Sequence, residues 1–242
     1  MGTPVIELND VDTVYEGERF PAIRNIDLQV DCGEFSVVLG PNGVGKTTLL
    51  ETINGLLSPT RGEVKVFGKD VQRFGGQIRK KIGYIPQDVS FDSLTPFLVK
   101  NVVLMGRYGK IGLIHRPQPS DWERARWALE QVGIREFEGR PIGKLSGGQQ
   151  QKVLIARMVA KDPSIMLLDE PFSNLDFVAV EEISDLICTL HDELSLTTAM
   201  VLHNLESIPS RCNRLILMGE GSIARTGDPD LMLNSDVLNA VY

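Results

Sequence analysis

The residues from Gly40 to Thr48, which read GPNGVGKTT, have the spacing of a phosphate-binding loop (P-loop). A glycine, four residues and then Gly-Lys-Thr match G-x-x-x-x-G-K-[ST], in which backbone N–H groups surround the phosphates. Lys46 would contact the β- and γ-phosphates, and the Thr47 hydroxyl would be a ligand to Mg²⁺. The alternative is a glycine-rich turn before an ordinary helix. We expect ATP-type phosphates to contact Gly40, Pro41, Asn42, Gly43, Gly45, Lys46, Thr47 and Thr48.

Two acidic residues follow a second apolar run. Ile165–Leu168 is typical of a buried strand, and Asp169 and Glu170 come directly after it. Parallel strands deliver their last residues to the edge of the sheet where α/β folds bind ligands. Asp169 would hold Mg²⁺, directly or through water, and Glu170 would act as general base on the attacking water. Taken alone, the pair could equally be two surface acids before a helix.

A second anion-binding feature lies at residues 145–149, which read LSGGQ. Ser146 and Gln149 have the Ser-x-x-Gln spacing of a capping box, which would cap any helix. Gly147 and Gly148 disfavour that helix by up to about 1 kcal/mol each, on the scale of helix interiors. They would expose bare backbone N–H groups at its first turn, which favours a second phosphate contact.

These chemical groups require a sheet whose strands end together. Period-two alternation, or short apolar runs bounded by turn residues, predicts strands at 5–8, 23–30, 35–39, 63–67, 82–85, 165–168, 198–202, 215–218 and 222–226. Apolar residues at helical spacing predict helices at 45–57, 97–107, 121–132, 147–160 and 177–194, and one after His203. Gly75-Gly76 is interpreted as a break, and residues 108–119 as a loop. The helical block between two strand-and-helix sections predicts one domain with a helical subdomain.

Composition narrows the class of protein. The chain has 242 residues, a net charge of −7 and a pI near 5.1, so its charge does not favour binding to nucleic acid or anionic membrane. Cys32, Cys188 and Cys212 lack metal-site spacing and are expected to be free buried thiols in a reducing cytoplasm. We see no signal peptide and no apolar run that could span a bilayer, so a membrane role would require a partner.

Taken together, these motifs resemble the ATP-binding cassette (ABC) ATPases along essentially the whole chain. Residues 40–48 resemble the Walker A motif, 145–149 the LSGGQ signature, and 165–170 the Walker B motif with its glutamate. Gln87 matches the glutamine of the Q-loop, residues 173–176 the D-loop with Asp176, and His203 the switch histidine. Tyr15 resembles the aromatic residue that stacks on adenine, with Phe20 as a nearby alternative. Lys152 and Asn174 depart from the commoner arginine and small residue.

The resemblance implies a P-loop NTPase core, with a mostly parallel sheet flanked by helices and an antiparallel N-terminal section. Residues 1–87 and 162–242 would form this core, and 88–161 the helical subdomain. Two such domains pair head to tail, so Ser146, Gly147, Gly148 and Gln149 of one chain would meet the γ-phosphate bound by the other. Glu170, His203 and Gln87 would be the catalytic residues, and Thr47, Gln87 and Asp169 would surround Mg²⁺. His115 and His191 are interpreted as loop and helix-surface residues without a ligand role.

The implied activity is ATP hydrolysis that powers an importer. The ATPase would act as a homodimer, or paired with a homologue, at the cytoplasmic face of the membrane. Its partners would be permease subunits, docked around 87–106, and indirectly a solute-binding protein, with no nucleic acid. Residues 102–109, 114–117 and 238–242 resemble the ATPases of zinc, manganese and iron-chelate importers. An iron-siderophore or cobalamin-type importer is the alternative, and a non-transport ABC ATPase, a P-loop kinase or GTPase, and a non-enzymatic scaffold fit less well.

Overall fold

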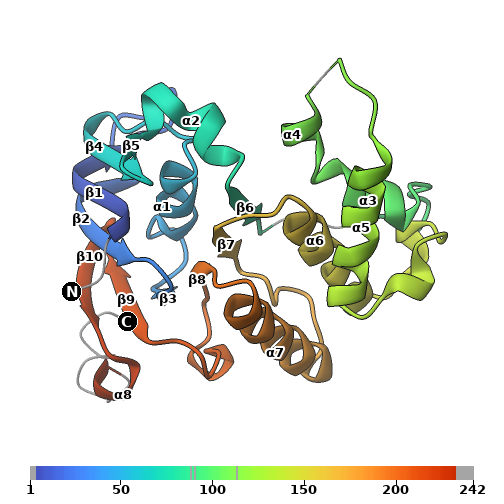
Figure 1. Ribbon diagram of the computed structural model, residues 1–242. Coiled ribbons are helices and arrows are strands. Elements are labelled where there is room, and N and C mark those ends of the chain that lie inside the picture. The colour runs from blue at the N-terminus through green and yellow to red at the C-terminus, as the bar shows by residue number, and fades with distance from the viewer. Residues whose placement is uncertain (1–3, 88, 90, 113, 233–242) are drawn as a thin grey trace.

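The computed structural model describes residues 4–87, 89, 91–112 and 114–232, and within them the central layer is a six-stranded sheet (Figure 1). Its order is β10-β9-β3-β8-β7-β6, and all neighbouring pairs are parallel except β9 with β10. The strands are β3 (Phe35–Leu39), β6 (Ile82–Ile85), β7 (Ile165–Asp169), β8 (Thr197–Val201), β9 (Arg214–Gly219) and β10 (Ser222–Gly227). Strands β3, β7 and β8 are buried along their whole length, as expected of parallel strands covered on both faces.

A second, antiparallel sheet stands beside the first and has the order β2-β1-β4-β5. Its strands are β1 (Pro4–Thr13), β2 (Ile23–Asp31), β4 (Arg61–Val66) and β5 (Lys69–Asp70). In β2 the buried Ile26, Leu28 and Val30 alternate with exposed Asp27 and Gln29, as period-two patterning requires. The mostly parallel sheet with an antiparallel N-terminal section confirms the predicted fold class.

The helices are α1 (Lys46–Ile53), α2 (Val71–Arg79), α3 (Val99–Met105), α4 (Tyr108–Ile111), α5 (Pro119–Gln131), α6 (Gly147–Ala160), α7 (Phe177–Glu193) and α8 (Pro229–Met232). Short 3₁₀ turns occupy Arg135–Phe137, Ile142–Lys144 and Leu205–Ser207. Helices α3, α5 and α6 pack against one another and form a helical region to one side of the sheet (Figure 1). Among the described residues, none of the helices combines the length and apolar character needed to cross a bilayer.

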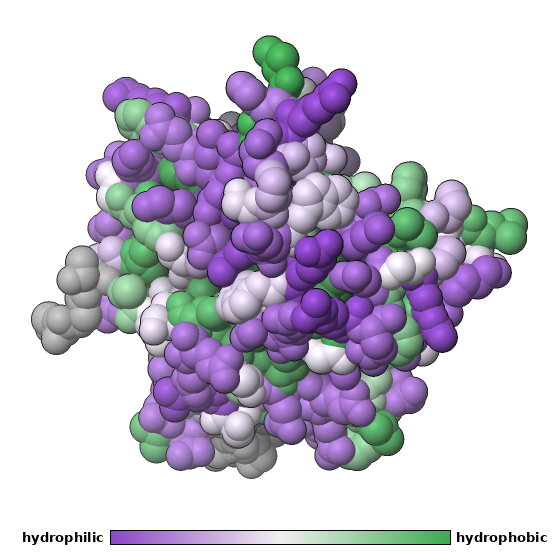
Figure 2. Space-filling model, turned by 45° about the vertical axis from the view of Figure 1, so that its right-hand side comes forward, coloured by the Kyte–Doolittle hydropathy of each residue, from purple (hydrophilic) through white to green (hydrophobic). Residues whose placement is uncertain are grey.

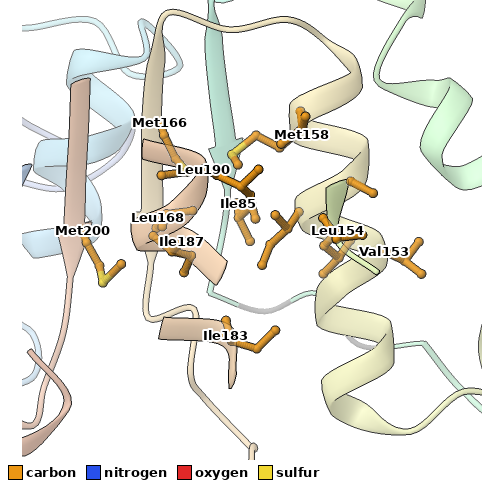
Figure 3. Packing of buried hydrophobic residues seen from close by; sticks show 14 of the residues in the cluster. Ile85, Val153, Leu154, Met158, Met166, Leu168, Ile183, Ile187, Leu190 and Met200 are labelled. Carbon is orange, nitrogen blue, oxygen red and sulfur yellow. The ribbon is translucent and has the colours of Figure 1, made fainter. Parts of the chain in front are cut away.

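The core has two parts, one on each face of the six-stranded sheet. Alternation along β7 sends Met166 and Leu168 to one face and Ile165 and Leu167 to the other. Figure 3 shows the first face, where Met166 and Leu168 meet side chains of α6 and α7. The second face packs on α1 and the antiparallel sheet. The rigid sheet therefore fixes both the P-loop helix and the signature helix.

Three helix predictions are wrong. Residues 108–119 are not all loop, because helix α4 (Tyr108–Ile111) begins that segment. Gly75-Gly76 does not break the chain but lies inside α2, whose N-cap Asp70 accepts a hydrogen bond from Arg73 N at 2.8 Å. Gly75 is buried there because the Arg79 guanidinium passes close to it and donates to Gly55 O at 2.6 Å. After His203 the chain forms only the 3₁₀ turn Leu205–Ser207, which the Asn204 side chain caps by accepting from Glu206 N.

Two burial predictions also need correction. His191 is not a helix-surface residue, because it is only 5% exposed and its Nδ1 lies 2.9 Å from the Thr198 hydroxyl. Cys32 is exposed, whereas Cys188 and Cys212 are half-buried, and all three are free thiols. Residues 238–242, one of the segments that suggested a metal importer, lie outside the described residues.

Candidate nucleotide site

The predicted chemical groups follow four parallel strands that are neighbours in the sheet, β3, β8, β7 and β6. The register pairs Asp169 with Val201, and Val201 with Val38, so these strands end at nearly the same level. The P-loop follows β3, Glu170 follows β7, His203 follows β8 and Gln87 follows β6. The sheet therefore brings together groups that are up to 163 residues apart in the sequence, from Gly40 to His203.

The P-loop turns sharply into α1 at Gly45, whose φ is 99°. A Cβ at Gly45 would lie 2.5 Å from Ala22 O, so no larger residue fits without a shift of the backbone. Lys46 is only 5% exposed, and its ammonium donates to Gly40 O at 2.7 Å and Pro41 O at 3.0 Å. Burial lowers the pKa of Lys46, and the nearby Glu170 and Asp169 oppose that shift.

A pocket of about 460 Å³ lies over this loop, within the usual range for small-molecule sites. It brings the P-loop together with the three predicted catalytic residues, and it also includes Ala22, which belongs to none of the sequence motifs. Its lining residues are Tyr15, Ala22, Asn42, Gly43, Gly45, Lys46, Thr47, Thr48, Gln87, Glu170 and His203.

Asp169 lies behind this pocket with its side chain buried and 1% of its surface exposed. Neither carboxylate oxygen makes a hydrogen bond of normal geometry to the described residues, although the Thr47 hydroxyl is close enough to favour the ionised form. Burial raises the pKa of Asp169 to about 6. Two unpartnered carboxylate oxygens beside a threonine hydroxyl are hard oxygen donors of the kind that Mg²⁺ prefers. The residues present therefore fit a magnesium ion.

Glu170 connects the predicted catalytic groups directly. Its Oε2 accepts a hydrogen bond from Gln87 Nε2 at 2.9 Å and lies 3.5 Å from His203 Nδ1. The Glu170 side chain is 12% exposed and lines the pocket. Its backbone is in the left-handed region, with a φ of 48°, which is uncommon outside glycine and costs of the order of 1 kcal/mol. Such strain is often found at functional positions, where it aims a side chain.

Tyr15 and Phe20 differ in how they meet the P-loop. The Tyr15 hydroxyl lies 2.9 Å from the Thr48 hydroxyl and donates to Glu51 at 3.4 Å, and the ring lines the pocket. Phe20 is 82% exposed. Tyr15 therefore lies at the P-loop pocket, and the contact of Tyr15 or of Phe20 with the base stays a prediction.

The LSGGQ segment begins α6 and forms the predicted capping box. Ser146 N donates to the Gln149 side chain at 3.0 Å, and Gln149 N donates to the Ser146 hydroxyl at 3.3 Å. Gly148 lies close to α7, because a Cβ there would be 3.2 Å from Ala179 Cβ. Asp176 caps α7 by accepting from Ala179 N at 2.9 Å.

Ser146, Gly147, Gly148, Gln149 and Asp176 line a second open hollow, which has no lining residue in common with the P-loop pocket. Of these residues, only Gly147 also lines the small hollow beside Gln87 and Glu170. The structure therefore separates the predicted residues into two groups on one chain.

Comparison with known proteins gives consistent matches. A family model described as ABC transporter matches residues 23–173. The manganese transport system ATP-binding protein MntB of Bacillus subtilis is 38% identical over 219 residues, which are 90% of this chain and 85% of that protein. The zinc transport system ATP-binding protein TroB of Treponema pallidum is 36% identical over 219 residues, 90% of this chain and 80% of that protein.

Solved structures agree with these matches. A metal-chelate type ABC transporter in an inward-facing conformation superposes with a TM-score of 0.85 at 28% identity, over 99% of this chain and 89% of that one. A bacterial ABC transporter cassette solved as a dimer superposes with a TM-score of 0.78 at 30% identity, over 93% of this chain and 98% of that one.

Proposed function

The chain belongs to the ABC transporter family, and from that premise we propose that it powers uptake of a manganese- or zinc-type metal ion through a separate membrane permease. The motif resemblance is thereby confirmed, and the chain is an ATP-binding and ATP-hydrolysing subunit. The observation that carries the catalytic assignment is the contact of Glu170 with Gln87 and His203 at the mouth of the P-loop pocket.

We assign the magnesium site to Thr47 and Asp169, with Gln87 at its margin. Asp169 contributes two buried oxygens that lack partners among the described side chains, and Thr47 contributes a hydroxyl beside them. When bound, Mg²⁺ would neutralise charge on the β- and γ-phosphates. Lys46 would exchange its backbone acceptors, Gly40 O and Pro41 O, for phosphate oxygens.

Glu170 is proposed as the residue that orients the attacking water and accepts its proton. Gln87 Nε2 fixes one carboxylate oxygen of Glu170, and the left-handed backbone aims the side chain at the pocket. His203 is 59% exposed at the rim of this pocket, where it can contact the γ-phosphate. A positioned general base of this kind contributes about 10²–10⁴-fold to the rate.

The two separate groups of residues support an ATPase that works as a pair of cassettes. On one chain, Ser146 and Gly148 line a hollow distinct from the P-loop pocket. A two-fold pairing would place this hollow of one cassette over the P-loop of the other and complete two equivalent sites. The dimeric relative gives a precedent for pairing. The second cassette would be a copy of this chain or a homologue.

Two observations support manganese or zinc as the transported ion. The relatives belong to manganese and zinc transport systems, and residues 102–109 and 114–117 resemble the ATPases of zinc, manganese and iron-chelate importers. An iron-chelate or cobalamin-type substrate is the second candidate, which the metal-chelate type neighbour favours. The transported ion would bind to the permease and its solute-binding protein, so His115 is not proposed as a ligand.

A surface for the permease is proposed around residues 87–106. Leu94 and Phe97 are 82% and 53% exposed, whereas Phe91 packs on the core and is not available. Figure 2 shows one face of the molecule, on which hydrophilic side chains dominate and hydrophobic residues form only small patches. Docking there would hold the ATPase at the cytoplasmic face of the membrane, and an amphipathic permease segment would be the natural occupant.

The test is transport by the reconstituted complex. A candidate permease should be co-purified with this chain and placed in liposomes that enclose ATP, so that an importer moves ions inward, toward the side on which its ATPase lies. We expect uptake of radioactive manganese or zinc that requires ATP and stops with Glu170→Gln. Uptake of an iron chelate or cobalamin without manganese or zinc would replace the metal assignment, and ATP hydrolysis without any of these substrates being moved would reject it.

A further inference from the structure

One buried polar atom beside the proposed magnesium site is not used by the mechanism above. The hydroxyl of Tyr84, on β6, has almost no exposed surface and makes no hydrogen bond among the described residues. A buried hydroxyl without a partner costs about 1–3 kcal/mol, so a chain gains nothing in stability by placing one here. Phenylalanine would fill the same space without that cost.

The register of the sheet places Tyr84 on the same face as Asp169. Tyr84 pairs with Leu167 across β6 and β7, and both pack in the part of the core that faces α1. Asp169 is two residues beyond Leu167, so strand alternation turns its side chain to that face as well. The long tyrosine ring and the carboxylate therefore share one space between the sheet and the P-loop helix.

The charges around the phenol agree with this placement. Burial raises the pKa of Tyr84, and the nearby Asp169, Glu51 and Tyr15 add to that shift. The protonated phenol is a hydrogen-bond donor, and the two carboxylate oxygens of Asp169 are acceptors without partners. Glu51 has a donor already, the Tyr15 hydroxyl at 3.4 Å.

We propose that Tyr84 is a positioning residue for the magnesium ligand Asp169. Its hydroxyl donates a hydrogen bond to one carboxylate oxygen through one water molecule, and thereby holds the other oxygen toward Thr47. The inference rests on the proposed magnesium site and adds to it a residue outside the recognised motifs. Because β6 also leads to Gln87 three residues later, the same strand positions two groups around the metal.

The test compares metal affinity in four forms of the full-length chain: wild type, Tyr84→Phe, Asp169→Asn and the double variant. Mn²⁺ is titrated into the complex with a non-hydrolysable ATP analogue and followed by electron paramagnetic resonance. We expect Tyr84→Phe to weaken Mn²⁺ binding about tenfold, as removal of an outer hydrogen bond to a metal ligand does. Affinity for the analogue in EDTA should be unchanged, and the melting temperature should be equal or higher.

The double variant and a control separate positioning from packing. If Tyr84 acts through Asp169, Tyr84→Phe should add no further loss in the Asp169→Asn background. Tyr108→Phe removes a hydroxyl from an exposed ring on α4 and should leave Mn²⁺ affinity unchanged.

Three results would overturn the inference and are distinguishable. If Asp169→Asn weakens Mn²⁺ binding but Tyr84→Phe does not, the magnesium site stands and the role of Tyr84 is rejected. If Tyr84→Phe lowers the melting temperature and weakens nucleotide binding in EDTA as well, the hydroxyl is structural and the role is again rejected. If Asp169→Asn itself leaves Mn²⁺ affinity unchanged, the proposed magnesium site fails and the inference fails with it.

Discussion

The P-loop pocket and the start of α6 both present a helix N-terminus, yet they are built in different ways. The P-loop is held by contacts with a segment outside it and by its own lysine. Gly45 packs against Ala22, and the buried Lys46 donates hydrogen bonds to Gly40 O and Pro41 O. The start of α6 is fixed by its own residues, because Ser146 and Gln149 cap each other. The first feature depends on the whole fold, whereas the second depends on four consecutive residues and presents an open surface.

The two regions also differ in what they contribute to the stability of the folded chain. The capping box stabilises α6 by about 1 kcal/mol. The P-loop side contains a carboxylate buried without a partner among the described groups and a left-handed glutamate, both of which destabilise the chain. Strain is concentrated at the proposed nucleotide site, whereas residues 146–149 at the start of α6 are capped and have no positive φ.

Replacing Glu170 should have the largest effect on turnover. We expect Glu170→Gln to lower the ATPase rate about 10²–10⁴-fold while ATP affinity is retained, because the amide cannot accept the proton of the attacking water. Steady-state hydrolysis and equilibrium binding of a fluorescent ATP analogue measure the two quantities. Glu123→Gln, on the exposed face of α5, is the matched control and should be active. Turnover close to wild type would remove Glu170 as the principal catalytic group.

Mixing two inactive variants should show whether the P-loop of one chain and the start of α6 of another form one active site. Ser146→Arg blocks the start of α6, and Lys46→Ala disables the P-loop, so each protein alone should hydrolyse little ATP. A mixed pair has one complete site, made from the P-loop of the first variant and the α6 start of the second, and should regain a substantial fraction of activity. Ser146→Arg should also bind ATP normally as a monomer.

The control for this mixture is Ser146→Arg with a chain that carries both substitutions, which leaves every site incomplete and should restore nothing. Light scattering establishes that pairs have formed. Pairs that form in the first mixture without any recovery of hydrolysis would contradict completion of the site by a second chain.

Two glycine-to-alanine substitutions should differ in their effect on the free energy of unfolding. Gly45→Ala places a Cβ 2.5 Å from Ala22 O at a φ of 99°, so we expect a loss of about 2–4 kcal/mol in the free energy of unfolding. Gly147→Ala meets only ordinary contacts, the nearest at 3.7 Å from Leu175, and should leave stability equal or slightly higher. It should nevertheless reduce hydrolysis, because a methyl group covers the exposed N–H groups. Equal loss of stability in both variants would remove the distinction between the two regions.

The smallest expected effect is the dependence of stability on pH at Asp169. Because the folded chain raises the pKa of Asp169 to about 6, it binds a proton more tightly than the unfolded chain, and this stabilising contribution disappears as the pH rises through 6. In EDTA at pH 7.5, Asp169→Asn should therefore be more stable than wild type by about 1–2 kcal/mol. The difference should vanish near pH 3.5. Urea unfolding at several pH values measures it, and a variant that is less stable at pH 7.5 would contradict the assigned burial cost.

Much of the architecture could be predicted because local signals agreed with the final packing. The predicted bounds of β3, β6 and α6 match the structure, since each is an apolar or capped segment with clear ends. Helix α2 was missed because the two glycines outweighed the other signals, a cap at Asp70 and the apolar residues Val71 and Ile78. Val71 and Ile78 are two turns apart and lie on the same, buried face of the helix. That cap was visible in the sequence and was the signal to use.

Other features depend on tertiary contacts that no local pattern contains. His191 is buried because β8 brings Thr198 against it. The unpartnered hydroxyl of Tyr84 and the alignment of Asp169 beside it follow from the register of β6 with β7. Completion of the site by a second chain is expected from the family resemblance and stays a prediction, since one chain shows two separate hollows.

The left-handed backbone at Glu170 has an evolutionary consequence. Glycine would adopt a φ of 48° without strain, so Glu170→Gly should relieve of the order of 1 kcal/mol while it removes the catalytic group. At this position a gain in stability and a loss of activity coincide. Selection for stability alone would therefore favour glycine at residue 170, whereas selection for ATP hydrolysis would favour glutamate.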